Sequence, residues 1–193
     1  MRKNLLIFAG LCLSLLCAGA AHAQVQIFGG YSYLRPTVTV QQPAITCPIG
    51  MTCPPTSATS HPNLNGWEVS GTYNMFKVLG LTADFGGNYG TVQGSPLHVN
   101  TYLFGPQVHF PGPVSPFAHV LIGEAHERIE GSNNSVVTPS SANAFATAVG
   151  GGIDIKTVPF ISLRLIQIDY LATHFGSRTQ NQPRASAGIV IHF

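Results

Sequence analysis

Seven side chains of this sequence are of the types that form ion pairs, carry protons or line a path for ions. They are four carboxylates, two guanidinium groups and one amide, namely Glu68, Asp84, Glu124, Asp169, Arg164, Arg184 and Gln107. A guanidinium can bind one carboxylate through two parallel hydrogen bonds and still donate to another neighbour. We therefore expect a single polar network in which Arg164 has the central place, provided that the fold brings these distant residues together.

Histidine close to serine and a carboxylate would indicate nucleophilic catalysis. The nearest such group in the sequence is His174 with Ser177, beside Asp169. A general base must face its nucleophile, yet no His-x-Ser pair occurs that would share one face of a strand. We therefore expect no catalytic site and no enzymatic activity.

The elements that would position these residues are eight segments in which apolar and polar side chains alternate. Successive residues of a strand point to opposite faces, so the pattern is typical of strands with one apolar and one polar face. The segments are residues 25–35, 65–76, 79–90, 98–110, 115–128, 143–156, 160–175 and 184–193. The connections are long at 36–64, 91–97, 129–142 and 176–183, and short around 77–78, 111–113 and 157–159. This alternation predicts an all-β fold, an eight-stranded antiparallel up-and-down transmembrane β-barrel.

Two of the eight segments do not alternate cleanly. In 160–175 the parity changes, so Arg164 and Asp169 both face the interior only if a bulge lies near Leu165 and Ile166. In 115–128 the parity of Glu124 is that of the apolar side chains, which leaves its face ambiguous. An interior of eight strands is just wide enough to be filled by side chains, so we expect the charged residues to plug it.

The last segment has its apolar residues at every second position and ends in an aromatic residue that carries the free carboxylate. Ile189, Ile191 and Phe193 would face lipid, and Ser186 and Val190 would face the interior. This is the pattern of the closing strand of an outer-membrane barrel. We expect these three apolar residues to be the signal that the barrel-assembly machinery recognises.

The first 23 residues have the form of a secretory signal peptide. A basic start is followed by an apolar run at 5–16, which is too short to span a bilayer, and by a small-x-small cleavage site at 21–23. We expect residues 1–23 to be removed and residues 24–193 to form the barrel domain.

Cleavage would also remove Arg2 and Lys3, which lowers the number of basic residues from 9 to 7 and makes it equal to the 7 acidic residues. A chain without net charge lacks the clustered cations that nucleic acid requires, so nucleic-acid binding is excluded. Only 8% of the residues are charged, against about 25% in soluble domains, and this favours a barrel with an apolar outer face.

Cys47 and Cys53 are the two cysteines after the predicted leader, and they lie in the proline-rich first connection. An even number of cysteines in an oxidising compartment favours a disulfide, which would stiffen this short loop locally. Two thiols and His61 do not supply the four ligands of a structural metal site. We therefore expect no metal and no cofactor.

The chain from residue 24 onward resembles the small eight-stranded outer-membrane barrels of the OmpA and OmpX type, which include porin-family proteins. The stretches that carry the resemblance are YLFGP at 102–106, PFAHV at 116–120, GGGID at 150–154, RLIQIDYL at 164–171 and SAGIV at 186–190. The resemblance implies a barrel, monomeric or weakly associating, without established catalysis. It also implies a role in adhesion or envelope integrity, as in several relatives.

These observations predict an outer-membrane barrel with a structural or surface-interaction role and a plugged interior. Both termini would lie in the periplasm and the long loops outside the cell. Its partners would be membrane lipids and lipopolysaccharide, periplasmic chaperones and the barrel-assembly machinery. The alternatives are a small diffusion channel or a transporter of small apolar molecules, and an enzyme that modifies lipid A.

Overall fold

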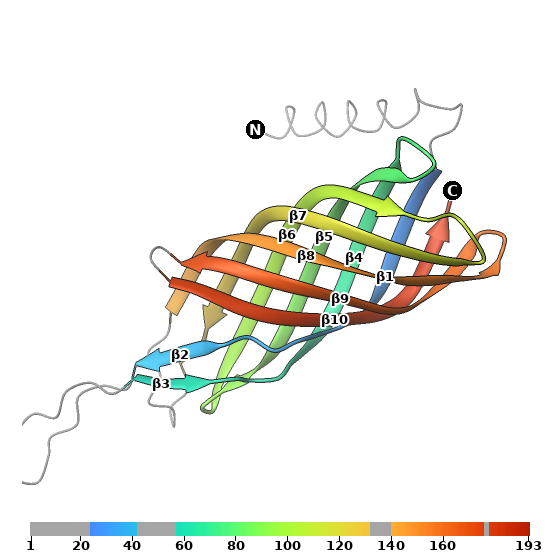
Figure 1. Ribbon diagram of the computed structural model, residues 1–193. Helices are drawn as coiled ribbons and strands as arrows, with labels where there is room; N and C mark the ends of the chain where they lie inside the picture. Colours follow the sequence, from blue (N-terminus) through green and yellow to red (C-terminus); the bar gives the residue numbers. More distant parts are fainter. Residues whose placement is uncertain (1–23, 42–56, 132–139, 176–177) are drawn as a thin grey trace, which may run out of the picture.

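The computed structural model describes residues 24–41, 57–131, 140–175 and 178–193, and in these ranges the chain forms a closed antiparallel barrel (Figure 1). The barrel strands are β1 (Gln24–Leu34), β4 (Leu64–Asn74), β5 (Leu79–Val92), β6 (Ser95–His109), β7 (Val114–Ile129), β8 (Ser140–Val158), β9 (Ile161–Phe175) and β10 (Arg178–His192). Each strand pairs with its neighbour along the chain, and β1 closes the barrel against β10. The predicted fold class, eight antiparallel strands in an up-and-down barrel, is confirmed.

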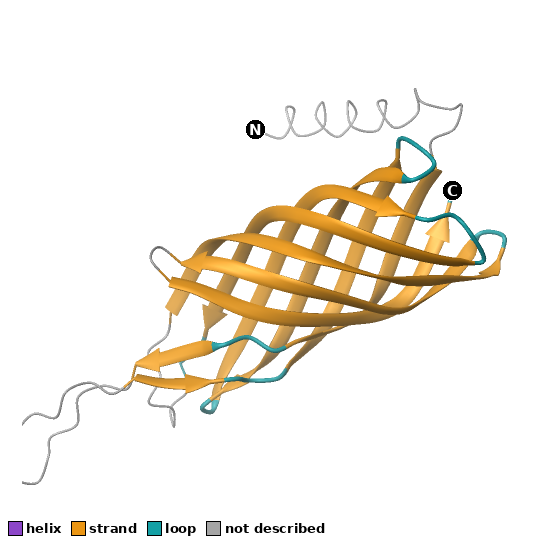
Figure 2. Ribbon diagram, in the orientation of Figure 1, coloured by secondary structure: helices purple, strands orange, loops and turns teal. Residues whose placement is uncertain are grey.

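Two further strands form a hairpin between β1 and β4. β2 (Val38–Gln41) pairs with β3 (Ser57–Ser60), and Figure 2 shows the hairpin at the end of the barrel opposite the start of β1 and the end of β10. We call these two ends the hairpin end and the terminal end. Cys47 and Cys53 lie outside the described residues, as do the predicted signal peptide and Ser177. No helix in the described ranges is long and apolar enough to cross a membrane.

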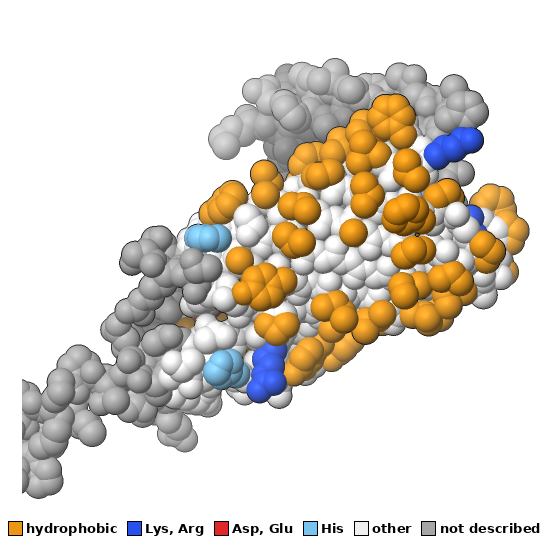
Figure 3. Space-filling model, viewed as in Figure 1, with side chains coloured by type: hydrophobic (Ala, Val, Ile, Leu, Met, Phe, Trp, Pro, Cys, Tyr) orange, Lys and Arg blue, Asp and Glu red, His pale blue; other side chains and the backbone are white. Residues whose placement is uncertain are grey.

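The strands bury their polar side chains and expose their apolar ones. In β4, Glu68 is fully buried and Ser70 is 5% exposed, whereas Trp67 is 46% and Val69 is 42% exposed. Figure 3 shows apolar side chains spread over the outer face, with Lys, Arg and His toward the two ends. A strand places successive side chains on opposite faces, so the alternation of the sequence puts the apolar face outside, as predicted.

The predicted bulge in β9 is confirmed. Ile153 of β8 lies opposite Ile166, but Asp154 lies opposite Arg164, so Leu165 has no partner residue in β8. Leu165 and Ile166 are both exposed, at 49% and 45%. Because two consecutive residues point outward here, Arg164 before the bulge and Gln167 and Asp169 after it all point to the interior.

The connections at the hairpin end are shorter than predicted. The expected long loop at 91–97 is wrong: β5 and β6 continue to a tight turn at Gln93 and Gly94. Both residues have positive φ, 48° and 82°, which a two-residue hairpin turn of this hand requires. β10 likewise begins at Arg178, well before the expected start at residue 184. In both places, backbone pairing with the neighbouring strand extends the strands through segments in which apolar and polar residues hardly alternate.

The interior of the barrel has two layers. Toward the hairpin end it is filled by a cluster of buried apolar side chains, which includes Leu34, Leu64, Leu97, Leu121 and Leu171, all fully buried. From the middle toward the terminal end it is filled by charged and amide side chains. The apolar layer was not predicted from the sequence, because an inward leucine such as Leu121, which lies between the outward Val120 and Ile122, resembles a lipid-facing residue in the sequence.

Candidate functional site

Arg184 of β10 lies at the centre of the polar layer. Its Nε and Nη2 donate to Oδ2 of Asp169 at 3.0 and 2.7 Å, and its Nη1 donates to Oδ1 of Asp84 at 2.9 Å. Oε2 of Glu68 lies 3.5 Å from Nε. Arg184 is only 1% exposed, so one buried guanidinium binds carboxylates from β4, β5 and β9 and ties these strands together across the barrel.

Arg164 of β9 binds a different carboxylate. Its Nε and Nη2 donate to the two oxygens of Asp154 at 2.8 and 3.0 Å, which is the bidentate arrangement. The guanidinium also lies between two aromatic rings, 4.4 Å from the centre of Phe28 and 4.1 Å from that of Phe117. The prediction that Arg164 is the central residue is wrong. Arg184 reaches three acids because it lies in the middle of the barrel, whereas Arg164 lies nearer the terminal end.

Gln167 joins the two guanidinium groups into one network. It accepts a hydrogen bond from Nη1 of Arg164 at 2.6 Å and donates to Glu68 at 2.7 Å and to Asp169 at 2.8 Å. Ser186 donates to the second oxygen of Glu68 at 2.5 Å, and Nε2 of His119 lies 2.8 Å from Oδ1 of Asp169. The members of the network come from six of the barrel strands, namely β4, β5 and β7 to β10.

Missing side chains make room for these groups. A Cβ on Gly150 would lie 2.1 Å from Oδ1 of Asp169, and one on Gly86 would lie 3.4 Å from Nη1 of Arg184. The absence of a side chain at Gly150 therefore allows the Asp169 carboxylate to approach the barrel wall closely, whereas a Cβ on Gly86 would make only an ordinary contact with the guanidinium. The run of three glycines at 150–152 lies within β8 and is not part of a phosphate-binding loop.

The other predicted network residues have separate positions. Gln107 is buried and accepts from Thr82 at 3.2 Å, nearer the terminal end than Arg184. The prediction that Glu124 belongs to the interior network is wrong, because its side chain is exposed on the outer face. β7 keeps one parity throughout, with Leu121 and Glu127 inside, so no bulge brings Glu124 inward.

The sequence assigned no role to His119 or Ser186, and it suggested Gln167 only as a neighbour to which Arg164 could donate, which the structure confirms. His119 is 4% exposed and Gln167 is 1% exposed, and both have the inward parity of their strands. Their inward parity was the one feature of the sequence that could have indicated a role in the network. In sequence, a polar strand residue that hydrogen-bonds inside the barrel does not differ from any other polar strand residue.

The catalytic group considered from the sequence is not brought together by the described residues. His174 is exposed on the outer face, whereas Asp169 is buried inside. Across the described ranges, no three side chains of His, Cys, Asp and Glu are arranged to hold a metal ion.

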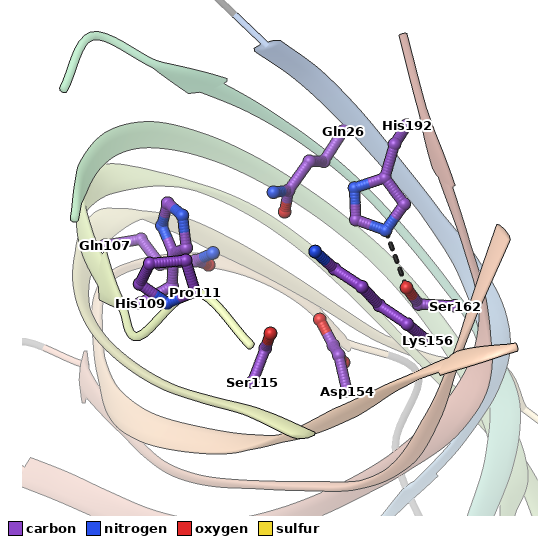
Figure 4. A pocket seen from close by; sticks show the side chains of 9 residues that line it. All are labelled: Gln26, Gln107, His109, Pro111, Ser115, Asp154, Lys156, Ser162 and His192. Carbon is purple, nitrogen blue, oxygen red and sulfur yellow. Dashed lines mark hydrogen bonds between the residues drawn. The ribbon is translucent and has the colours of Figure 1, made fainter. Parts of the chain in front are cut away.

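A polar cavity opens at the terminal end, beyond Arg164 and Asp154. It has a volume of about 50 Å³ and is lined by inward-facing residues of six strands and by Pro111 (Figure 4). Toward the middle of the barrel the ion-pair network closes this cavity, and the apolar layer lies behind the network. The arrangement is that of a plug, in which side chains fill the interior and hold the strands together.

Comparison with protein-family models and with curated proteins gives no match for this chain. Three solved structures are similar to it over nearly their whole lengths. Ail, the attachment invasion locus protein of Yersinia pestis, is 13% identical with a TM-score of 0.57, and the match covers 90% of this chain and 100% of Ail. Neisserial surface protein A is 14% identical with a TM-score of 0.57, covering 91% and 99% of the two chains. OprG of Pseudomonas aeruginosa is 10% identical with a TM-score of 0.57, covering 91% and 98%. The chain therefore has the fold of the small eight-stranded outer-membrane barrels.

Proposed function

We propose that this protein is an integral outer-membrane barrel with a structural or surface-interaction role and a closed interior. The observation that carries the proposal is the inverted distribution of side chains. Arg184, Glu68 and Asp84 are at most 1% exposed, whereas Val149 and Ile168 on the outer face are 56% and 58% exposed. An outer face of apolar side chains is unfavourable in water, whereas it is favourable in the hydrocarbon core of a bilayer.

Aromatic side chains support a position across a bilayer. Phe76, Phe110 and Phe160 lie in the short turns of the terminal end, and Phe193 ends the chain there, with exposed fractions of 63% to 69%. Toward the hairpin end, exposed Tyr31, Trp67, Tyr89 and Tyr102 lie on neighbouring strands. Aromatic residues gather at both boundaries of a transmembrane barrel, so these two sets would mark the interfaces.

The β2–β3 hairpin supports the surface-interaction role. It projects from the hairpin end, and outer-membrane barrels carry their longer loops outside the cell. In this orientation both termini lie in the periplasm and the hairpin meets lipopolysaccharide or an external partner. Ail, whose name refers to attachment, has been crystallised with a heparin analogue.

The packed interior favours this role over a diffusion channel. A path for water would have to cross the ion-pair network and then the apolar layer around Leu121 and Leu171. A transporter of small apolar molecules would need an apolar route through the wall, and the eight strands pair in an unbroken ring.

The test is single-channel recording of the barrel, residues 24–193, refolded into a planar bilayer. Folding is first confirmed by a change in gel mobility on heating. We expect insertion into the bilayer without discrete openings. Stable openings in the folded barrel would contradict the closed interior, and failure to insert into lipid under refolding conditions would contradict the membrane location.

A further inference from the structure

The cavity at the terminal end is lined by hydrogen-bond donors that point toward its centre from different sides. In Figure 4, Lys156 reaches into the space between Gln26 and His192, while Gln107 and His109 lie across the cavity. Ser162 and Nε2 of His192 are joined by a hydrogen bond of 2.7 Å. These residues come from five strands, so a ligand in the centre would be surrounded.

The cations at this end of the barrel outnumber the anions. Lys77 and Lys156 line a neighbouring cavity of about 490 Å³, which shares His109 with the first one. Asp154 is the carboxylate side chain that lines the polar cavity, and both of its oxygens already accept hydrogen bonds from Arg164. The terminal carboxylate of Phe193 follows His192 at the same end, and it is the other anionic group there.

One lining group has an unused hydrogen-bonding atom. Nδ1 of His109 is buried and has no partner among the described residues. Buried polar atoms in folded proteins are nearly always paired, so this nitrogen, in a cavity that Lys156 also lines, is available to bind a ligand or a water. A ligand that accepts hydrogen bonds would satisfy the imidazole and the ammonium together.

We propose that this cavity binds a tetrahedral oxyanion, either free sulfate or phosphate or the phosphate of a lipid headgroup. Lys156 supplies the positive charge, and His109, His192 and the amides of Gln26 and Gln107 supply donors around the anion. A tetrahedral ion accepts hydrogen bonds in all directions, which suits donors from opposite walls better than a planar carboxylate does. Asp154 does not repel it strongly, because Arg164 neutralises that carboxylate.

The test uses sulfate, which keeps its double charge between pH 5 and pH 8. The barrel, refolded in a neutral detergent, is titrated with sodium sulfate by calorimetry against chloride as the ionic-strength control. We expect a single site, about tenfold weaker in Lys156→Gln and in His109→Gln because each removes a charged or otherwise unpaired donor. Arg35→Gln and His174→Gln are the matched controls, since both residues lie toward the hairpin end, and they should bind sulfate as the unchanged protein does.

Binding should strengthen as the pH falls from 8 to 5, because protonated imidazoles of His109 and His192 add charge to that of Lys77 and Lys156. The same change in pH should alter binding less in the double variant His109→Gln, His192→Gln. Gel mobility before and after heating shows that each variant is folded. The absence of saturable sulfate binding, or equal affinity in folded Lys156→Gln, would overturn the proposal.

A second arm identifies the source of the anion. Short-chain phosphatidylglycerol is added to the sulfate complex, with phosphatidylcholine of the same chain length for comparison. Displacement of sulfate by the anionic lipid assigns the cavity to a lipid headgroup, and retention of sulfate assigns it to a free oxyanion. Both outcomes support an oxyanion site at the terminal end.

Discussion

Replacing Arg184 by methionine should destabilise the barrel more than any other single loss of charge in the network. Methionine keeps much of the volume but leaves three carboxylates without their shared cation. Asp84 loses the most, since its one hydrogen bond among the described residues comes from Arg184 and its Oδ2 has no partner there. Asp169 and Glu68 keep bonds from Gln167, so their loss is smaller.

Removing one partner of a buried ion pair costs about 3–5 kcal/mol, and we expect Arg184→Met to lie in this range. The measurement is urea unfolding of the barrel in phosphatidylcholine vesicles. Trp67 is the only tryptophan of the chain and is 46% exposed on the outer face, so its fluorescence reports loss of contact with lipid. Folding and unfolding are compared to show that the free energy is an equilibrium value.

The matched control is Arg128→Met, because the Arg128 side chain is 61% exposed and its contact with Glu130 is 3.5 Å long. An exposed pair of this kind is worth less than about 1 kcal/mol. Adding Asp84→Asn to Arg184→Met should recover part of the lost stability, since it removes one unpaired charge. The reasoning would be refuted if Arg184→Met were no less stable than Arg128→Met, or if the added substitution recovered nothing.

Three further outcomes are expected. Arg164→Ala should lower the free energy of unfolding by about 2–4 kcal/mol in the same urea assay. The substitution leaves both oxygens of Asp154 unpaired and empties the space between the rings of Phe28 and Phe117. An unchanged free energy of unfolding would remove Arg164 from the network. Glu124→Gln should change stability by less than about 1 kcal/mol, because the side chain is exposed on the outer face; a loss as large as that of Arg164→Ala would place Glu124 inside. Deleting Phe193 should reduce the amount of folded barrel in the outer membrane, measured by heat-shifted mobility in membrane fractions, and normal levels would show that the assembly signal does not need this residue.

Local alternation in the sequence was enough to predict the eight barrel strands, their antiparallel order and most of the inward faces, but not the β2–β3 hairpin. The prediction was possible because each strand has one face toward the polar interior and one face that forms part of the apolar outer surface. A period of two residues is therefore visible within a single segment. The bulge at Leu165 and Ile166 was predictable for the same reason, since it is a break in that period.

Only the tertiary structure decided which charges meet. Arg184 and Arg164 have the same chemistry, and their order of importance depends on how far along the barrel each one lies and which carboxylates reach that level. The stagger of the strands and the space left by Gly150 determine this level, and neither can be read from the sequence of a single strand. The face of Glu124, the apolar layer and the convergence of Lys156 with two histidines likewise depend on residues from strands far apart in the chain.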